Sequence, residues 1–320
     1  MKIEHNIYKY HNVSNVIIDD DKIWFTSGWC NFLFSADKST GEINFAKRIP
    51  VGGALMSGSV SCLFEKGKYI YIIMNRLEDN IVRFNVINNE FDIINSRIPK
   101  SYFSLATDED NIHILLPMWN LKQLIVLNEG DLSYRKLEFP LCKGSGIQMI
   151  QKYDQGFALV ENGTDDLVLL DGGLNEIKRI SDKPKDYQSF CDKAYSVYGL
   201  EIYEDMVYIF PGNSNSLYSV NLSDNRIQEK TRFTLNSQVI PTFSCVRKIG
   251  DHIWSFCNAS NSWKIYDMDL NVVKEYKMHF AGNVIEELKN AKYSDDIKPG
   301  NSILLGEDEF RPLRDFINTI

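Results

Sequence analysis

Short apolar stretches alternate with polar turns along most of this chain, and the stretches have the length of β-strands rather than of helices. One order of features recurs at six places: a small residue, an apolar stretch, a polar turn, and a second apolar stretch carrying an aromatic residue or histidine. These copies begin at Ser14, Ser61, Ser104, Gly146, Gly199 and Ser244. Their second stretches carry Trp24, Tyr71, His113, Phe157, Tyr208 and Trp254 at equivalent positions.

A second landmark ends a third apolar stretch in every copy. It is an Asp or Asn, a short polar side chain that bonds to nearby backbone N–H groups and starts a tight turn. The six residues are Asp37, Asn85, Asn128, Asp171, Asn221 and Asp267. A fourth apolar–polar stretch follows each of these turns, so every copy is expected to hold four antiparallel strands, and in the last copy this fourth strand is VVKEYKMHF at 272–280.

Four antiparallel strands repeated at intervals of roughly 45 residues match the blades of a β-propeller. A single blade cannot bury both of its faces, so neighbouring blades have to stack. The sequence therefore predicts an all-β fold: a propeller of six four-stranded blades over residues 1–282, with a short helical tail at 283–320 packed on it. A β-sandwich or a solenoid is the alternative architecture, and a seventh blade assembled from the two chain ends is the alternative blade number.

The segments outside the repeat carry separate expectations. Residues 2–10 resemble one extra strand that would pair with the last blade. The connection at 181–198 is longer than its counterparts and would be a lid, a partner contact or surface decoration. In the tail, helical spacing puts Phe310, Leu313, Phe316 and Ile317 on one face, which would pack on the propeller or dock a partner.

Composition and charge narrow the class of protein. The chain has 320 residues, 44% of them apolar, and a net charge of −8, which opposes sequence-independent binding to nucleic acid. The first residues lack the apolar segment of a secretory signal, and no stretch has the length of a membrane span. The six cysteines show no C-x-x-C pair. We therefore expect a cytoplasmic protein with reduced thiols, no nucleic-acid partner and no membrane association.

The loops between the second and third strands (the B–C loops) are the expected binding surface, because in propellers they share one face with the connections between blades. These loops are rich in Asn, and two of them contain Trp. Aromatic rings beside amide groups suit sugars and peptides, whereas Asn alone is also a common turn residue. The candidate ligand-binding residues are Trp29, Asn31, Arg76, Trp119, Asn120, Glu161, Asn213 and Asn258.

Recognisable catalytic motifs are missing from the sequence. The chain has only five His, and it contains no G-x-S-x-G elbow, phosphate-binding loop, H-E-x-x-H or EF-hand spacing, so no cofactor and no metal is predicted. Metal-binding propeller enzymes take their ligands from separate blades, which leaves no local motif. Glu161 and Glu201 would be the acids to test in such an enzyme.

The strand–turn–strand cadence resembles the broad group of six-bladed propellers that includes NHL-type and YncE-like bacterial proteins. The resemblance covers about residues 12–280, is clearest in LFSADKSTGEI at 33–43, and lacks both the WD dipeptide and the kelch double glycine. It implies a binding platform, by analogy of architecture alone.

The leading hypothesis is a binding or scaffold propeller that presents its B–C loop face to a protein, a peptide or a small glycan. One alternative is a metal- or acid-dependent hydrolase, lyase or isomerase acting in the central channel. Another is a structural subunit of a larger assembly.

Overall fold

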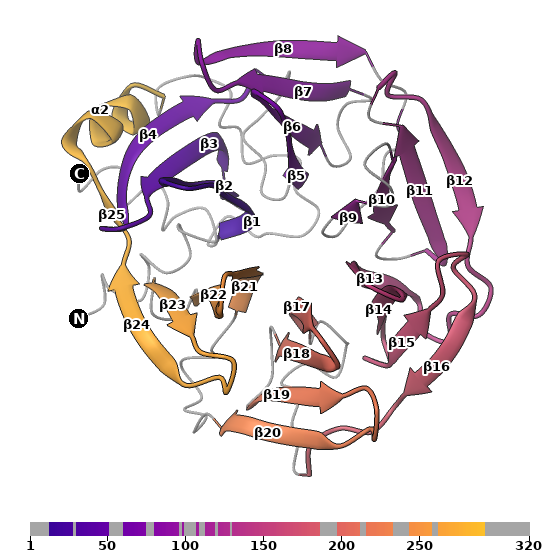
Figure 1. The fold of residues 1–320 in the computed structure, drawn as a ribbon. Coiled ribbons are helices and arrows are strands. Elements are labelled where there is room, and N and C mark those ends of the chain that lie inside the picture. Colours follow the sequence, from indigo (N-terminus) through magenta and orange to yellow (C-terminus); the bar gives the residue numbers. More distant parts are fainter. Residues whose placement is uncertain are drawn as a thin grey trace, which may run out of the picture. The chain divides into compact units, whose positions relative to one another are not determined.

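The computed structural model describes residues 13–27, 30–50, 60–74, 80–95, 98, 107–108, 113–118, 121–128, 130–185, 197–211, 216–232, 243–257 and 262–291. They form six antiparallel four-stranded sheets, the first of which gains a fifth strand. This is a β-propeller with six four-stranded blades (Figure 1). The all-β class, the six blades and the short C-terminal helix predicted from the sequence are confirmed.

The chain divides into two compact units, and the first comprises Met1–Lys100, Ser260–Trp263 and Glu275–Ile320. It holds the first two blades. Blade 1 consists of β1 (Val13–Ile18), β2 (Lys22–Ser27), β3 (Cys30–Asp37) and β4 (Glu42–Arg48). Blade 2 consists of β5 (Val60–Lys66), β6 (Tyr69–Met74), β7 (Asn80–Asn85) and β8 (Glu90–Asn95).

The second unit comprises Ser101–Ala259 and Lys264–Lys274 and holds the next three blades and much of the sixth, whose remaining residues belong to the first unit. Blade 3 consists of β9 (Thr107–Asp108), β10 (His113–Pro117), β11 (Gln123–Asn128) and β12 (Tyr134–Glu138). Blade 4 consists of β13 (Gly146–Tyr153), β14 (Gly156–Asn162), β15 (Leu167–Leu170) and β16 (Glu176–Ile180). Blade 5 consists of β17 (Val197–Tyr203), β18 (Met206–Pro211), β19 (Ser216–Asn221) and β20 (Ile227–Arg232). Blade 6 consists of β21 (Phe243–Ile249), β22 (His252–Cys257), β23 (Ser262–Tyr266) and β24 (Val272–Lys277).

The polar landmark found in the sequence starts the turn between the third and fourth strands of each blade. In every case its side-chain Oδ1 accepts a hydrogen bond from the backbone N–H two residues further on. The turn prediction is therefore confirmed at Asp37, Asn85, Asn128, Asp171, Asn221 and Asp267.

Each of these six turns also holds one residue in the left-handed region of backbone space. The residues are Gly41, Asn89, Leu132, Leu174, Asn225 and Leu270, with φ between 58° and 76°. Gly and Asn adopt this conformation at little cost, whereas Leu does so against steric strain. All six turns thus share one backbone geometry, although three of them hold Leu at the position that Gly or Asn would suit better.

The core lies between the blades and is built from the middle strands. In the second unit, β11, β15, β18 and β19 contain no Lys, Arg, Asp or Glu. The aromatic landmarks Trp24, Tyr71, Phe157, Tyr208 and Trp254 are all buried. In the first unit Trp24 packs against Phe45 and Phe84, so burial of apolar surface between blade 1 and blade 2 stabilises their stacking.

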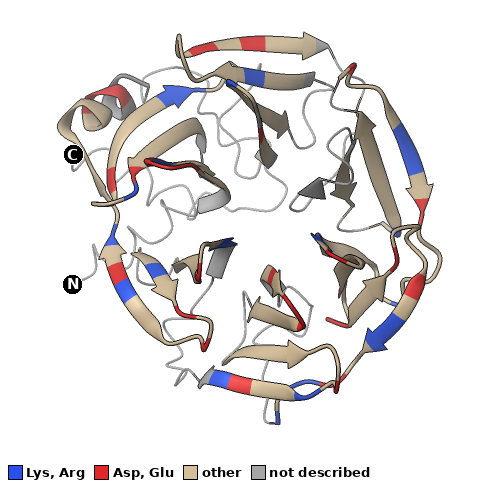
Figure 2. Ribbon diagram, viewed as in Figure 1, with Lys and Arg blue, Asp and Glu red and all other residues tan. Residues whose placement is uncertain are grey.

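In blades 2 to 6 the fourth strand has no further strand partner among the described residues, so it is an open edge, and its composition protects it. In the second unit β12 reads YRKLE, β16 reads EIKRI and β20 reads IQEKTR. Figure 2 shows this band of Lys, Arg, Asp and Glu on these strands. Charged side chains on an edge strand discourage pairing with a second chain.

The segment after blade 6 returns to blade 1. The sequence pattern predicts that MHF at 278–280 continues the fourth strand of the sixth repeat, but that strand, β24, ends at Lys277. The separate strand β25 (His279–Phe280) instead pairs in parallel with Glu42 and Ile43 of β4. The short parallel pairing is anchored by the hydroxyl of Tyr276, which donates a hydrogen bond to the carbonyl of Lys38 at 2.7 Å.

Helix α2 (Gly282–Ala291) follows at once and lies against β4 (Figure 1). Val284 is buried, and the side-chain amide of Asn283 donates to the carbonyl of Asn44 at 3.1 Å. The expected strand at 2–10 and the expected apolar face at 310–317 lie outside the described residues.

Candidate functional site

Most of the residues predicted to bind a ligand lie outside the described part of the chain. This is so for Trp29, Arg76, Trp119, Asn120, Asn213 and Asn258. Asn31 lies in β3, where only its backbone is described. Glu161 is the one candidate whose side chain and contacts are described in full, and its assignment as a ligand-binding residue stays a prediction.

Glu161 lies near the end of β14 with no exposed surface. Its carboxylate accepts hydrogen bonds from the backbone N–H groups of Lys143 and Gly144, at 3.0 to 3.1 Å, and from the hydroxyl of Thr164 at 3.1 Å. A carboxylate offers about four lone-pair positions. With a further bond from Arg179, the chain itself occupies them.

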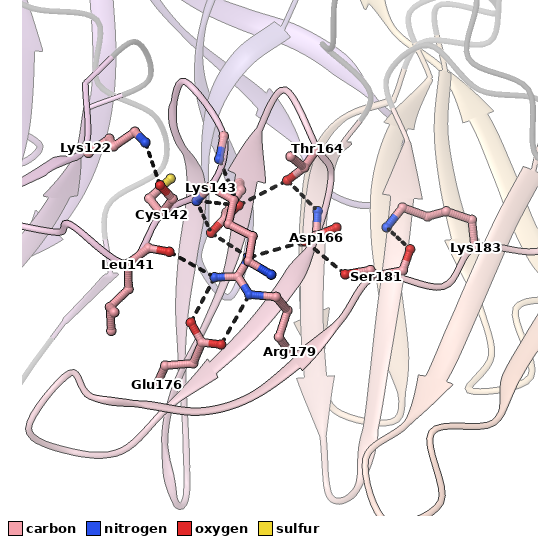
Figure 3. Close-up of polar contacts among 12 residues, drawn as sticks. Lys122, Leu141, Cys142, Lys143, Thr164, Asp166, Glu176, Arg179, Ser181 and Lys183 are labelled. Atoms are coloured by element: carbon pink, nitrogen blue, oxygen red, sulfur yellow. Dashed lines mark hydrogen bonds and ion pairs between the residues drawn. The ribbon is translucent and has the colours of Figure 1, made fainter.

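Arg179 in β16 is the centre of this network (Figure 3). Its Nη1 donates to Glu161 at 2.8 Å and to Asp166 at 3.2 Å. Its Nε and Nη2 donate to Glu176, and Nη2 also donates to the carbonyl of Leu141. All five N–H donors of the guanidinium are therefore used, and these partners, Glu176 first, raise its pKa. Nothing in the local sequence EIKRI distinguishes Arg179 from other edge-strand cations, so sequence reasoning missed it.

The network binds two loops together at one end of blade 4. The connection at 141–145 and the B–C loop at 163–166 are joined through Glu161, and the N–H of Ser145 also donates to the carbonyl of Asn162 at 2.7 Å. Gly144 sits so close that an added Cβ would lie 2.2 Å from that carbonyl oxygen. We call the exposed residues of these loops the blade-4 rim: Leu141, Lys143, Ser145, Gly163 and Thr164.

Two titratable groups lie beneath the blade-4 rim. Burial raises the pKa of Asp165 to about 6, and the positive charge of Lys183 partly opposes that shift. Burial lowers the pKa of Lys183, against the pull of Asp166 and Asp165. The net charge of this loop therefore changes just below neutral pH, where Asp165 gains or loses a proton.

A second buried acid, Glu201, lies in β17, the first strand of blade 5. It is 5% exposed, and burial raises the pKa of its carboxyl to about 7, against the positive charge of Arg247. Its Oε1 has no hydrogen-bond partner among the described residues. A carboxyl with these properties can exchange a proton near neutral pH.

The position of Glu201 is apolar in blades 1 and 2. It pairs across strands with the aromatic landmark Tyr208, and the corresponding partners of Trp24 and Tyr71 are Ile17 and Phe64. Phe64 stacks on Tyr71 at a centroid distance of 4.8 Å. Blades 4 and 6 place Lys152 and Arg247 there. Three consecutive blades of the second unit therefore replace a packing residue by a charged one.

Two further features are absent from the described part of the chain, a grouped metal site and a membrane-spanning helix. Among the described residues, no three or more His, Cys, Asp or Glu side chains are grouped to hold a metal ion. Within the same residues, no helix is long and apolar enough to cross a bilayer.

Comparison with known proteins supports the fold. No protein-family model matches the chain, and no curated protein matches its sequence. A solved structure of a catalytically inactive variant of virginiamycin B lyase from Staphylococcus aureus with quinupristin is similar, with a TM-score of 0.59 and 17% identity over 85% of this chain and 86% of the lyase.

Two further structures with TM-scores above one half are similar in the same way. A chain of a nidogen/laminin complex gives 0.57 with 11% identity over 81% of this chain and 94% of its own. The WD40 domain of Pan2 from Neurospora crassa gives 0.54 with 11% identity over 85% and 80%. At these identities the likeness shows a β-propeller and no more.

Proposed function

We propose that this protein is a binding or scaffold propeller that presents its B–C loop face to a protein, a peptide or a small glycan. The observation that carries the proposal is the buried network of Glu161, Arg179 and Asp166, which fixes the two loops of the blade-4 rim. Loops that are held in one conformation lose less entropy on binding than mobile ones.

The chemistry of the blade-4 rim suits a peptide or a sugar. Leu141 is 52% exposed and offers an apolar contact. Lys143 adds a positive charge, and Ser145 and Thr164 add hydroxyl oxygens that can accept, since their hydrogens are donated to the carbonyl of Asn162 and to Glu161. Two of the similar propellers are a chain of a nidogen/laminin complex and a WD40 domain, which supports a binding role by analogy.

The test is a screen of the full chain against a peptide library and a glycan array. Wild type is compared with Leu141→Ser and Lys143→Glu, and with the control Ile177→Ser. Ile177 is a matched control because it is 58% exposed on the outer strand β16 of the same blade. A partner that is lost in both rim variants and kept in the control supports the proposal. A screen without hits, or hits that all variants keep, rejects it.

One observation favours an enzyme as the second candidate. Glu201 combines burial, an oxygen without a partner among the described residues and a pKa of about 7, which is the range of a general acid or base at neutral pH. The similar lyase makes quinupristin a direct trial substrate. Wild type should consume it and Glu201→Gln should not. Equal turnover by both proteins, or none by either, rejects this candidate.

A further inference from the structure

The first strands of blades 5 and 6 approach each other closely beside Glu201. An added Cβ on Gly199 of β17 would lie 1.9 Å from Cγ2 of Val246 in β21, so there is no room there for a side chain. Two positions further along β17, on the same face of that strand, the side chain is the carboxyl of Glu201. The absence of a side chain at Gly199 therefore brings β21 close enough for its cations to act on Glu201.

The carboxyl of Glu201 is only half satisfied. A hydrogen bond from the backbone N–H of Lys248 favours its ionised form, but Oε1 has no partner in the described structure. Leaving a buried oxygen unpaired costs free energy, whereas an apolar residue such as Ile17 or Phe64 at the same position has no such cost. A charged residue at a position that tolerates apolar packing therefore indicates a role other than packing.

The groups around Glu201 are mostly positive. From β21 come Arg247 and Lys248, whose charges lower the pKa of Glu201. From blade 5 come Tyr203 and Tyr208, both with raised pKa values and hence uncharged at neutral pH. No ion pair joins Glu201 to either cation among the described residues. Lys248 lies over the ring of Tyr203, at 4.2 Å from its centroid.

Within the described part of the chain, Arg247 uses little of its hydrogen-bonding capacity. It is half-buried, and its Nη1 donates to the carbonyl of Val246 at 3.0 Å. A guanidinium has five donors in a fork that matches the two oxygens of a carboxylate. The carboxyl of Glu201, whose pKa is raised by burial and lowered in part by the charge of Arg247, supplies a donor as well when it is protonated.

We propose that Glu201 and Arg247 form a binding site for a small monocarboxylate anion. Arg247 binds the two oxygens of the anion, and the protonated carboxyl of Glu201 donates a hydrogen bond from Oε1 to one of them. One negative charge meets one guanidinium, so the occupied site is neutral apart from Lys248. A dianion such as phosphate brings an excess of charge into a site that holds a second carboxyl.

The sign of the pH dependence follows from the proton on Glu201. The anion binds the protonated form, so affinity is highest below the pKa of about 7 and falls as pH rises through it. Between pH 6 and pH 8 the protonated fraction falls about tenfold, and the affinity should fall by the same factor.

The site is distinct from the blade-4 rim, so this inference does not rest on the proposed loop-face function. It names the ligand class of the site used by the second candidate. Variants at Glu201 and Arg247 should leave any partner of the blade-4 rim bound. A failure of this proposal can therefore be distinguished from a failure of the proposed binding function of the blade-4 rim.

The experiment measures binding of acetate, lactate and inorganic phosphate to the full chain by NMR titration at pH 6 and pH 8. Wild type should bind the monocarboxylates about tenfold more tightly at pH 6. Glu201→Gln, whose amide donates at any pH, should bind them equally at both. Arg247→Ala should abolish binding, and Arg247→Lys should weaken it, because a lysine cannot make the bidentate hydrogen bonds of a guanidinium.

Glu65→Gln is the matched control, because Glu65 is an acid on the first strand of blade 2 with a pKa also raised by burial. It should bind as wild type does, and a thermal melt of each variant at pH 6 verifies that it is folded. The proposal is overturned by no monocarboxylate binding in wild type, by binding that survives Arg247→Ala, by an unchanged pH dependence in Glu201→Gln, or by tighter binding of phosphate.

Discussion

Arg179 and Glu161 are joined at 2.8 Å across blade 4, although the strand β15 lies between their strands β14 and β16. Both side chains are nearly inaccessible, at 9% and 0% exposed. The pair therefore lies in a medium where each charge depends on the other, because neither is well solvated.

Removing the guanidinium should be strongly destabilising. We expect Arg179→Met to lower the free energy of unfolding by about 3–5 kcal/mol, because it leaves Glu161 buried without a countercharge. Lys230→Met is the control, since its partner Asp269 is 81% exposed and such pairs contribute at most about 1 kcal/mol. Urea denaturation measures both, and equal losses would contradict a special role of the network.

The Asp and Asn residues that start the turns could be predicted from the sequence, whereas the hydrogen-bond network around Arg179 could not. The residues that start the turns, from Asp37 to Asp267, act on backbone two positions away, so their role is visible in a local pattern. Glu161 acts on loops and on Arg179, which is 18 residues away and marked by no motif. The position of Glu161 on the loop face could be predicted, whereas the hydrogen bonds that its carboxylate accepts from other residues of the chain could not.

The same distinction explains the error at the C-terminus. MHF continues the apolar pattern of the last repeat, so a local reading keeps it in that strand. Its pairing with Glu42 and Ile43 depends on contacts more than two hundred residues apart, which periodicity does not encode. Glu201 was named as an acid worth testing, but its unpaired oxygen depends on the approach of β21.

The strained turns allow a second prediction. Leu132 has φ of 58° and only partial burial, so Leu132→Gly should raise the free energy of unfolding by up to about 1 kcal/mol as the strain is relieved. Leu270 has φ of 61° but is 1% exposed in the core between blades 5 and 6. Leu270→Gly should therefore lower it by about 2–5 kcal/mol. Thermal melts of the two variants distinguish these outcomes. A loss of stability in both variants would mean that strain at these turns is negligible.

The pKa of Glu201 predicts how stability changes with pH. The folded-state pKa of about 7 lies above the ordinary carboxyl pKa of 4.5, so the folded chain holds the proton more tightly than the unfolded chain. The resulting stability is complete below pH 4.5 and is lost as pH rises through 7, with a size on the order of 3 kcal/mol. Comparing the unfolding free energies of wild type and Glu201→Gln at several pH values should show a difference that shifts across this window. A constant difference would show that Glu201 titrates normally.

The close approach of β17 and β21 can be tested by exchanging the side chains that create it. Gly199→Ala places a Cβ at 1.9 Å from Cγ2 and 2.6 Å from Cβ of Val246, so it should cost at least about 1–3 kcal/mol by overpacking. Val246→Gly alone should also be destabilising, because it empties a fully buried position.

The double variant Gly199→Ala with Val246→Gly moves the side chain from one strand to the other. The new Cβ then occupies the space that Val246 has left, and only the Cβ of Phe210, at 3.1 Å, still requires a small adjustment. We expect the double variant to lose less stability than the sum of the two single variants, by about 0.5–3 kcal/mol. Denaturant titration of all four proteins measures this coupling. Additive losses would mean that the two strands are not in contact at Gly199, and the position of Glu201 against β21 would then lose its support.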